Sequence, residues 1–259
     1  MKRLILCAVP AFLLLVASCK KDPETPKDVF KGPEVNMGSG KAWAWVRLGS
    51  DRQPVEVGAS FTHSAFQNLP AGGSGHEHEG AFLLRLPNEK EQTPFNHVVV
   101  NWNPNGHFPE PVYGKPHFDF HFYTETPEYV NAIPPYAQAP ADFDNLPPAG
   151  SLHPQYIPTD GGEAAMGKHW VDITSPELQP ENPAPFTETF LFGTFKGKVL
   201  FYEPMITRQF MENTPAFEKT IKQGTKFAKD GYYPTRMRIV KTATTYDVIM
   251  DKFEFHKAS

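Results

Sequence analysis

Residues 101–123, NWNPNGHFPEPVYGKPHFDFHFY, contain the strand pattern that decides the fold. From residue 116 onward, apolar and polar side chains alternate. Successive side chains of a β-strand point to opposite faces, whereas a helix would scatter both sets around its axis. One face would carry Phe118, Phe120 and Phe122, and the other His117, Asp119, His121 and Tyr123. We therefore predict a strand with an apolar core on one side and a polar cavity or groove on the other.

The composition favours a β-rich domain with long ordered loops. The chain has 259 residues, of which 40% are hydrophobic and 21% are charged, enough for a sizeable core. Its 27 prolines concentrate between the periodic runs, which suits strands joined by loops better than a helical fold. The formal net charge is −4 and no long basic run exists, so nucleic acid is a poor candidate partner.

Residues 1–18 are typical of an export signal. Lys2 and Arg3 precede an apolar run at residues 4–16, which is too short for a comfortable transmembrane helix. The following VASC sequence resembles the lipobox of bacterial lipoproteins, whose cysteine carries the lipid. We expect Cys19 to be lipidated and to anchor the protein to a membrane, because acyl chains contribute roughly 0.8 kcal/mol per buried methylene. An ordinary secretory signal, or a cysteine placed there by chance, is the alternative.

Residues 19–38 are predicted to be a tether between this anchor and the domain. They are charged and contain three prolines, as expected for an extended spacer. The sequence Lys20-Lys21-Asp22 also resembles short signals that send some Bacteroidetes lipoproteins to the cell surface, although a generic linker explains it equally well. The expected location is the bacterial cell envelope, as an outer-membrane lipoprotein that faces either the periplasm or the exterior.

Residues 39–259 are predicted to form a single domain, a β-sandwich or a jelly-roll-like barrel. Alternating patterns predict a hairpin at 41–61, strands at 80–87 and 95–102, a hairpin at 187–203 and closing strands at 234–256. One helix is expected at about 205–228. Residues 126–158 are Pro-rich with few periodic features, which predicts a long ordered loop.

The polar face of the central strand is a candidate metal site. The proposed ligands are His117, Asp119, His121 and His169, with His107 and Glu203 as additional candidates. The only two cysteines are Cys7 in the signal and Cys19, so the ligands must be nitrogen and oxygen. A divalent ion is expected, and zinc, iron, manganese and copper are not distinguished. His76 and His78, in a Gly-rich loop, are a weaker candidate pair.

Strand geometry limits how these residues share an ion. Same-face neighbours lie roughly 6.6 Å apart at Cα, so His117 and His121 would be about 13 Å apart. With metal–nitrogen bonds near 2.0–2.1 Å, both rings reach one ion only by stretching from opposite ends or through a β-bulge. Asp119 is central, either as a ligand or as a hydrogen-bond partner of an imidazole. The alternative is a hydrogen-bonded polar cluster without any ion.

The strings WNPNGHFPEPVYGKPHFDFHFY, GKHWVD and GTFKGKVLFYEPMIT resemble a small family of uncharacterised secreted bacterial proteins. Its type member is a Thermus protein under the control of an extracytoplasmic-stress sigma factor. The likeness covers nearly the whole chain after the tether, but it implies no activity. The histidine-rich strand, the glycine-flanked His169 and the later Glu203 also look like a distorted cupin arrangement. Cupins have HxH at the strand, however, whereas this chain has HxDxH.

Three classes of function remain open. The first is a binding protein of the cell envelope for a divalent metal or a small ligand. The second is a metal-dependent, cupin-like enzyme whose ion activates water or oxygen. No nucleophile elbow, phosphate-binding loop or HExxH helix indicates a named reaction. The third is a structural protein without metal, which assembles as a homo-oligomer through its sheets.

Overall fold

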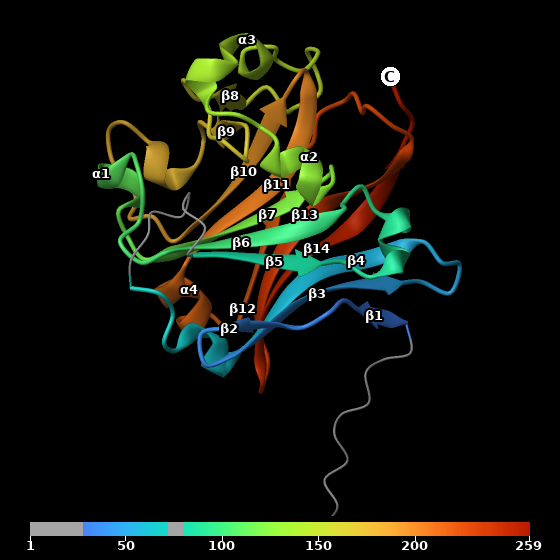
Figure 1. The fold of residues 1–259 in the computed structure, drawn as a ribbon, viewed down its shortest axis with the longest axis vertical. Helices are drawn as coiled ribbons and strands as arrows, with labels where there is room; N and C mark the ends of the chain where they lie inside the picture. Colours follow the sequence, from blue (N-terminus) through green and yellow to red (C-terminus); the bar gives the residue numbers. More distant parts are fainter. Residues whose placement is uncertain (1–27, 72–79) are drawn as a thin grey trace, which may run out of the picture.

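Two antiparallel β-sheets packed face to face make up the fold (Figure 1). The computed structural model describes residues 28–71 and 80–259, and within them each sheet has seven strands. The mainly β prediction is therefore confirmed, in the form of a sandwich. The export signal, Cys19 and the loop histidines His76 and His78 lie outside the described residues. In the described part of the chain, no helix is long and apolar enough to cross a membrane.

The first sheet has the strand order β1-β3-β4-β14-β13-β12, and β2 also pairs with β3. Its β3–β4 pair corresponds to the hairpin predicted at 41–61, and β13 and β14 correspond to the closing strands predicted at 234–256. The strands are β1 (Val29–Lys31), β2 (Val35–Met37), β3 (Gly40–Leu48), β4 (Pro54–Thr62), β12 (Ala216–Thr220), β13 (Gly231–Lys241) and β14 (Thr245–His256).

This sheet begins earlier than the predicted domain boundary at residue 39. Both β1 and β2 lie in the segment that the sequence analysis assigned to the tether. Met37 is buried in the core, and Phe30 and Val35 pack against it. The tether prediction is therefore wrong for residues 28–38. Short strands there carry one apolar side chain every few residues, and the surrounding charges and Pro33 hide so brief a pattern.

The second sheet has the strand order β5-β6-β7-β11-β10-β9-β8, with β7 near its middle. The predicted strand at 116–123 is β7, and the predicted hairpin at 187–203 is the β10–β11 pair. The strands are β5 (Ala81–Arg85), β6 (His97–Asn103), β7 (His117–Tyr123), β8 (Tyr156–Pro158), β9 (Lys168–Asp172), β10 (Glu188–Phe195) and β11 (Lys198–Thr207).

The core between the sheets is rich in aromatic side chains. Phe118, Phe120 and Phe122 of β7 all point into it and are fully buried. Phe120 packs edge-on against Phe61 of the opposite sheet, with ring centroids 5.5 Å apart, and Phe118 stacks on Phe66 at 4.6 Å. Such pairs contribute roughly 0.5–1.5 kcal/mol beyond the area that they bury. The apolar face predicted for this strand therefore joins the two sheets.

Short helices and loops cover the other face of the second sheet, α2 and α3 most visibly (Figure 1). The helices are α1 (Glu110–Tyr113), α2 (Pro127–Asn131) and α3 (Pro140–Phe143), and the last two interrupt the predicted long loop at 126–158. Their apolar side chains pack against Phe201, while those of the α1 region pack against Met205. Glu203 lies between these residues on the same face of β11. A polar strip is thus enclosed between two apolar clusters.

The helix predicted at about 205–228 is wrong in most of its length. Strand β11 continues to Thr207, helix α4 covers only Arg208–Asn213, and β12 follows at Ala216–Thr220. The Thr207 side chain caps α4 by accepting a hydrogen bond from the Phe210 amide, at 3.3 Å. Pro215 then ends any helical continuation, because its ring cannot donate to the helix. The next residues pair with β13 as an edge strand.

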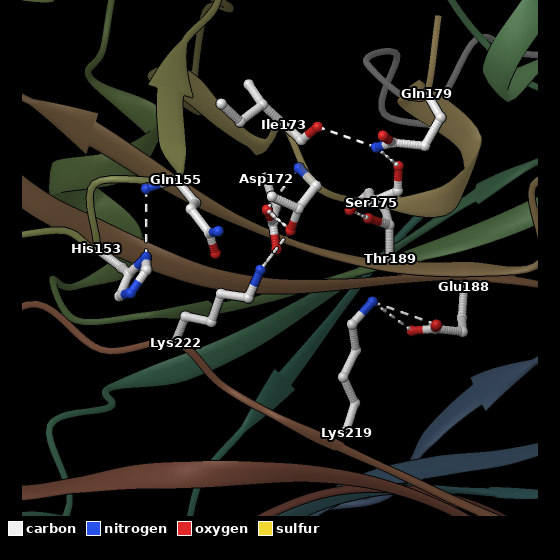
Figure 2. Close-up of polar contacts among 11 residues, drawn as sticks. His153, Gln155, Asp172, Ile173, Ser175, Gln179, Glu188, Thr189, Lys219 and Lys222 are labelled. Carbon is white, nitrogen blue, oxygen red and sulfur yellow. Dashed lines mark hydrogen bonds and ion pairs between the residues drawn. The ribbon is translucent and has the colours of Figure 1, made fainter. Parts of the chain in front are cut away.

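Polar contacts join β12 and the residues after it to the second sheet (Figure 2). Lys219 of β12 lies 3.2 Å from both carboxylate oxygens of Glu188 on β10. Lys222 reaches Asp172 at the end of β9, with 2.6 Å between Nζ and Oδ2. Asp172 also accepts hydrogen bonds from the backbone amide and hydroxyl of Thr174. These ion pairs are partly buried, so they hold one open side of the sandwich together.

Candidate metal centre

The pairing of the strands brings the residues of the polar strip together on the outer face of the second sheet. On β7, His117, Asp119 and His121 alternate with the core phenylalanines, as predicted. Asp119 is paired with Met205 of β11, so the next outward-facing residue of β11 toward His121 is Glu203. His169 of β9 is paired with Gly193 of β10, which brings a histidine in from the side. Three strands therefore converge on Glu203.

The first group contains His107, His117 and Asp119. Nε2 of His117 lies 3.2 Å from Oδ1 of Asp119, and Nε2 of His107 lies 3.4 Å from Oδ2. Each ring donates its Nδ1 proton to a backbone carbonyl, His117 to Lys115 at 2.6 Å and His107 to Phe108 at 2.9 Å. A carbonyl can only accept, so these contacts place a proton on each Nδ1 and direct Nε2 at the carboxylate.

The second group contains His121, His169 and Glu203. Nε2 of His121 lies 3.4 Å from Oε1 of Glu203, and Nε2 of His169 lies 3.5 Å from Oε2. The ring of Phe201 packs edge-on against both imidazoles, with centroids 4.8 Å and 5.3 Å away. Gly193 makes room for that ring, because a Cβ atom at this position would lie 1.9 Å from it.

Each nitrogen–oxygen distance in the two groups is close to the edge of a metal coordination shell, and within each group the two histidines face different oxygens of the carboxylate. In a tetrahedral site with bonds of 2.0–2.1 Å, ligand atoms lie roughly 3.3–3.4 Å from one another. The four nitrogen–oxygen distances are 3.2, 3.4, 3.4 and 3.5 Å. Charge-assisted hydrogen bonds are shorter, near 2.7–2.9 Å. Moreover, His117 Nε2, Asp119 Oδ1 and Glu203 Oε2 are buried and make no hydrogen bond within the described residues.

The pKa values of the two buried carboxyl groups are shifted in opposite directions. Burial alone would raise the pKa of Asp119, but the nearby charges of His117 and His107 outweigh burial and hold the pKa well below its usual range. Asn103 also donates to Asp119, with 2.7 Å between Nδ2 and Oδ2. Burial raises the pKa of Glu203 well above its usual range, and the charge of Asp119 raises it further. In the absence of a cation, these shifts favour the ionised form of Asp119 and the protonated form of Glu203.

The six residues named from the sequence all lie in this strip, but in two groups of three. The register of β7 against both neighbours is regular between His117 and His121, with no bulge to bring the two rings together. His117 instead lies beside Asp119, and His121 lies beside Glu203. Sequence reasoning missed Asn103, although Asn101 and Asn103 alternate with apolar residues on β6 and thus face the same way as Asp119. Nothing in the sequence pattern pointed to Gly193.

A comparison with protein-family models finds a match for one part of the chain. Residues 49–102 match the family model TTHB210-like, described as hypothetical protein TTHB210. This match confirms the resemblance to an uncharacterised Thermus family. The matched segment ends before His107, so it contains none of the six candidate ligands. No curated protein and no solved structure matches this chain.

Proposed function

We propose that this protein binds divalent transition-metal ions at its two histidine–carboxylate groups. The observation that carries the proposal is the pair of buried sets, each with two imidazole nitrogens and one carboxylate within 4.8 Å of one another. Imidazole suits zinc, copper, iron and nickel, and carboxylate adds manganese, so the donors favour this class of metals over calcium. Backbone carbonyls orient His107 and His117 in the way that metal-binding histidines are commonly held.

Each group has one histidine that gives access from solvent. The His107 and His169 side chains are 15% and 17% exposed, whereas the other four ligands are almost fully buried. An ion can therefore enter past these two rings. With three protein ligands, the ion keeps at least one open position.

The open position favours a metal-dependent enzyme as the second candidate function. Structural zinc sites use four protein ligands, whereas catalytic sites use three and leave a place for water or substrate. Two histidines and one carboxylate are also the ligands of many iron(II) oxygenases. A bound ion in either group would lower the pKa of its water and polarise a bound carbonyl or phosphoryl oxygen.

We also propose that the protein acts at the bacterial cell envelope, held by a lipid on Cys19. The support is the charged start, the short apolar run and the lipobox-like VASC sequence. Metabolic labelling with a fatty-acid analogue tests this. Wild-type protein is expected to be labelled and Cys19→Ala to be unlabelled and released from membranes. Unlabelled wild-type protein would rule the anchor out.

Metal analysis of the untagged protein tests the binding function. After loading with zinc and dialysis, we expect two ions per wild-type chain by mass spectrometry of the elements. Asp119→Asn and Glu203→Gln keep side-chain size but remove a charged ligand, so each is expected to lose one ion independently. Asp247→Asn, a partly buried carboxyl of the first sheet, is the matched control and should keep both. Wild-type protein without zinc would leave the strip as a hydrogen-bonded structural cluster.

A further inference from the structure

Tyr113 is a buried residue beside the polar strip, and it is not one of the six proposed metal ligands. It ends helix α1 and is 4% exposed. Its ring packs edge-on against Phe186, with centroids 5.0 Å apart, and lies 5.9 Å from the ring of His107. Phe186 in turn packs against His117 at 5.4 Å. The tyrosine therefore belongs to the wall that surrounds the first metal group.

The hydroxyl of Tyr113 has no hydrogen-bond partner among the described residues. A buried hydroxyl without a partner is unfavourable, and in native structures it commonly marks a place for water, an ion or a ligand. Burial raises the pKa of this phenol, and the negative charges of Glu177, Glu203 and Asp119 raise it further. The hydroxyl is thus a buried donor without an acceptor among the described residues, on a side chain that packs beside His107.

The charges around Tyr113 decide which ligand fits. Without metal, the negative charge of Asp119 would repel an anion. With a divalent ion in each metal group, four formal positive charges would face three negative ones, so the strip would attract an anion. An oxygen anion could then bind the open coordination position of an ion and accept a hydrogen bond from the phenol. Charge-assisted hydrogen bonds of this kind are stronger than neutral ones.

We propose that Tyr113 completes a binding pocket for a small oxyanion, such as a carboxylate, on the metal of the His107, His117 and Asp119 group. This inference rests on the proposed metal binding. The oxyanion coordinates the ion through one oxygen and accepts the Tyr113 hydrogen bond. Access is past His107, the most exposed member of that group.

The experiment uses cobalt(II) as a spectroscopic metal and formate as the oxyanion. Wild-type protein loaded with cobalt is titrated with formate, and the visible absorption bands report binding at the ion. Tyr113→Phe is expected to keep the wild-type cobalt content but to bind formate roughly tenfold more weakly, the effect of one lost hydrogen bond to a charged ligand. Tyr156→Phe is the matched control, because this equally buried tyrosine packs on Phe192 in the core, and it should behave like wild type.

Thermal unfolding of the metal-free proteins provides a second readout. The Tyr113 hydroxyl has no partner within the described structure, so its removal is expected not to lower the midpoint. Equal formate affinity in wild type and Tyr113→Phe would overturn the inference while leaving metal binding intact. So would a wild-type cobalt spectrum that formate leaves unchanged, or loss of cobalt from Tyr113→Phe. Wild-type protein that takes up no cobalt would instead refute the metal function itself.

Discussion

Asp119 and Glu203 are buried on the same face of the second sheet, and their surroundings shift their pKa values in opposite directions. Two imidazoles and the Asn103 amide stabilise the charged form of Asp119, whereas Glu203 is buried beside that charge. A metal ion at Glu203 must displace a proton, because only the carboxylate form is a good ligand. Metal uptake by the second group is therefore expected to be linked to pH.

The metal-free protein is expected to lose stability as the pH rises above the usual pKa of Glu203, near 4.5. The unfolded chain releases this proton near that pH, whereas the folded chain retains it up to the raised pKa. Folding therefore binds a proton in this interval, and the free energy of unfolding falls by about 1.4 kcal/mol per pH unit.

Urea unfolding of metal-free wild type and Glu203→Gln, from about pH 5 to about pH 8, measures this effect. The glutamine cannot titrate, so the stability of the variant should depend less on pH. His107, whose raised pKa gives the same sign, remains in both proteins and thus cancels in the comparison. Identical slopes would show that Glu203 is ionised in the folded protein.

At the scale of elements, strand β10 positions the second group although it supplies no ligand. Its register against β11 shifts between Gly193 and Thr194. The glycine leaves space for the ring of Phe201, which in turn contacts the imidazoles of His121 and His169. The geometry of this group thus depends on a residue that has no side chain.

Gly193→Ala is expected to weaken the second metal group and spare the first. The new methyl group would overlap the Phe201 ring, and overpacking of this kind typically costs 1–3 kcal/mol of stability. Zinc titration calorimetry of the variant should show one of the two sites weakened. Gly231→Ala is the control, because the nearest atom to its Cβ position is 3.7 Å away. If both sites of Gly193→Ala bind zinc as in wild type, the position of the Phe201 ring does not affect metal binding.

The strand pattern predicted much of this architecture, and its failures have identifiable causes. Alternation in β7 alone was sufficient to assign Phe120 to the core and Asp119 to the polar face. The division into two groups was not predictable, because it depends on the register that places Glu203 rather than another residue beside His121. The helix at 205–228 failed because Phe210 and Phe217, spaced like a helical stripe, lie on α4 and on an edge strand.

At the scale of the whole molecule, the aromatic core and the candidate metal ligands lie on opposite faces of the second sheet. One face of the second sheet forms the aromatic core with the first sheet, and the other carries the polar strip. Short helices cover that other face (Figure 1). A change on the core face should therefore alter the free energy of unfolding but not the affinity of the metal groups.

Phe120→Ala tests this separation. The ring is fully buried against Phe61, so its loss leaves a cavity and is expected to cost roughly 3–5 kcal/mol of stability. Denaturant unfolding measures the cost, and zinc analysis of the folded fraction should still give two ions per chain. Loss of metal from folded Phe120→Ala would mean that the core sets the geometry of the strip.

The two candidate metal groups differ in how their residues are attached to the fold. His107 belongs to a loop between β6 and α1, whereas His121, His169 and Glu203 all lie on hydrogen-bonded strands. Loops open locally at a small free-energy cost, whereas central strands separate only with much of the sheet. The first ion should therefore be kinetically labile and the second inert. Exchange of bound zinc against an enriched zinc isotope should then proceed in two phases, the fast one belonging to the group that Asp119→Asn removes.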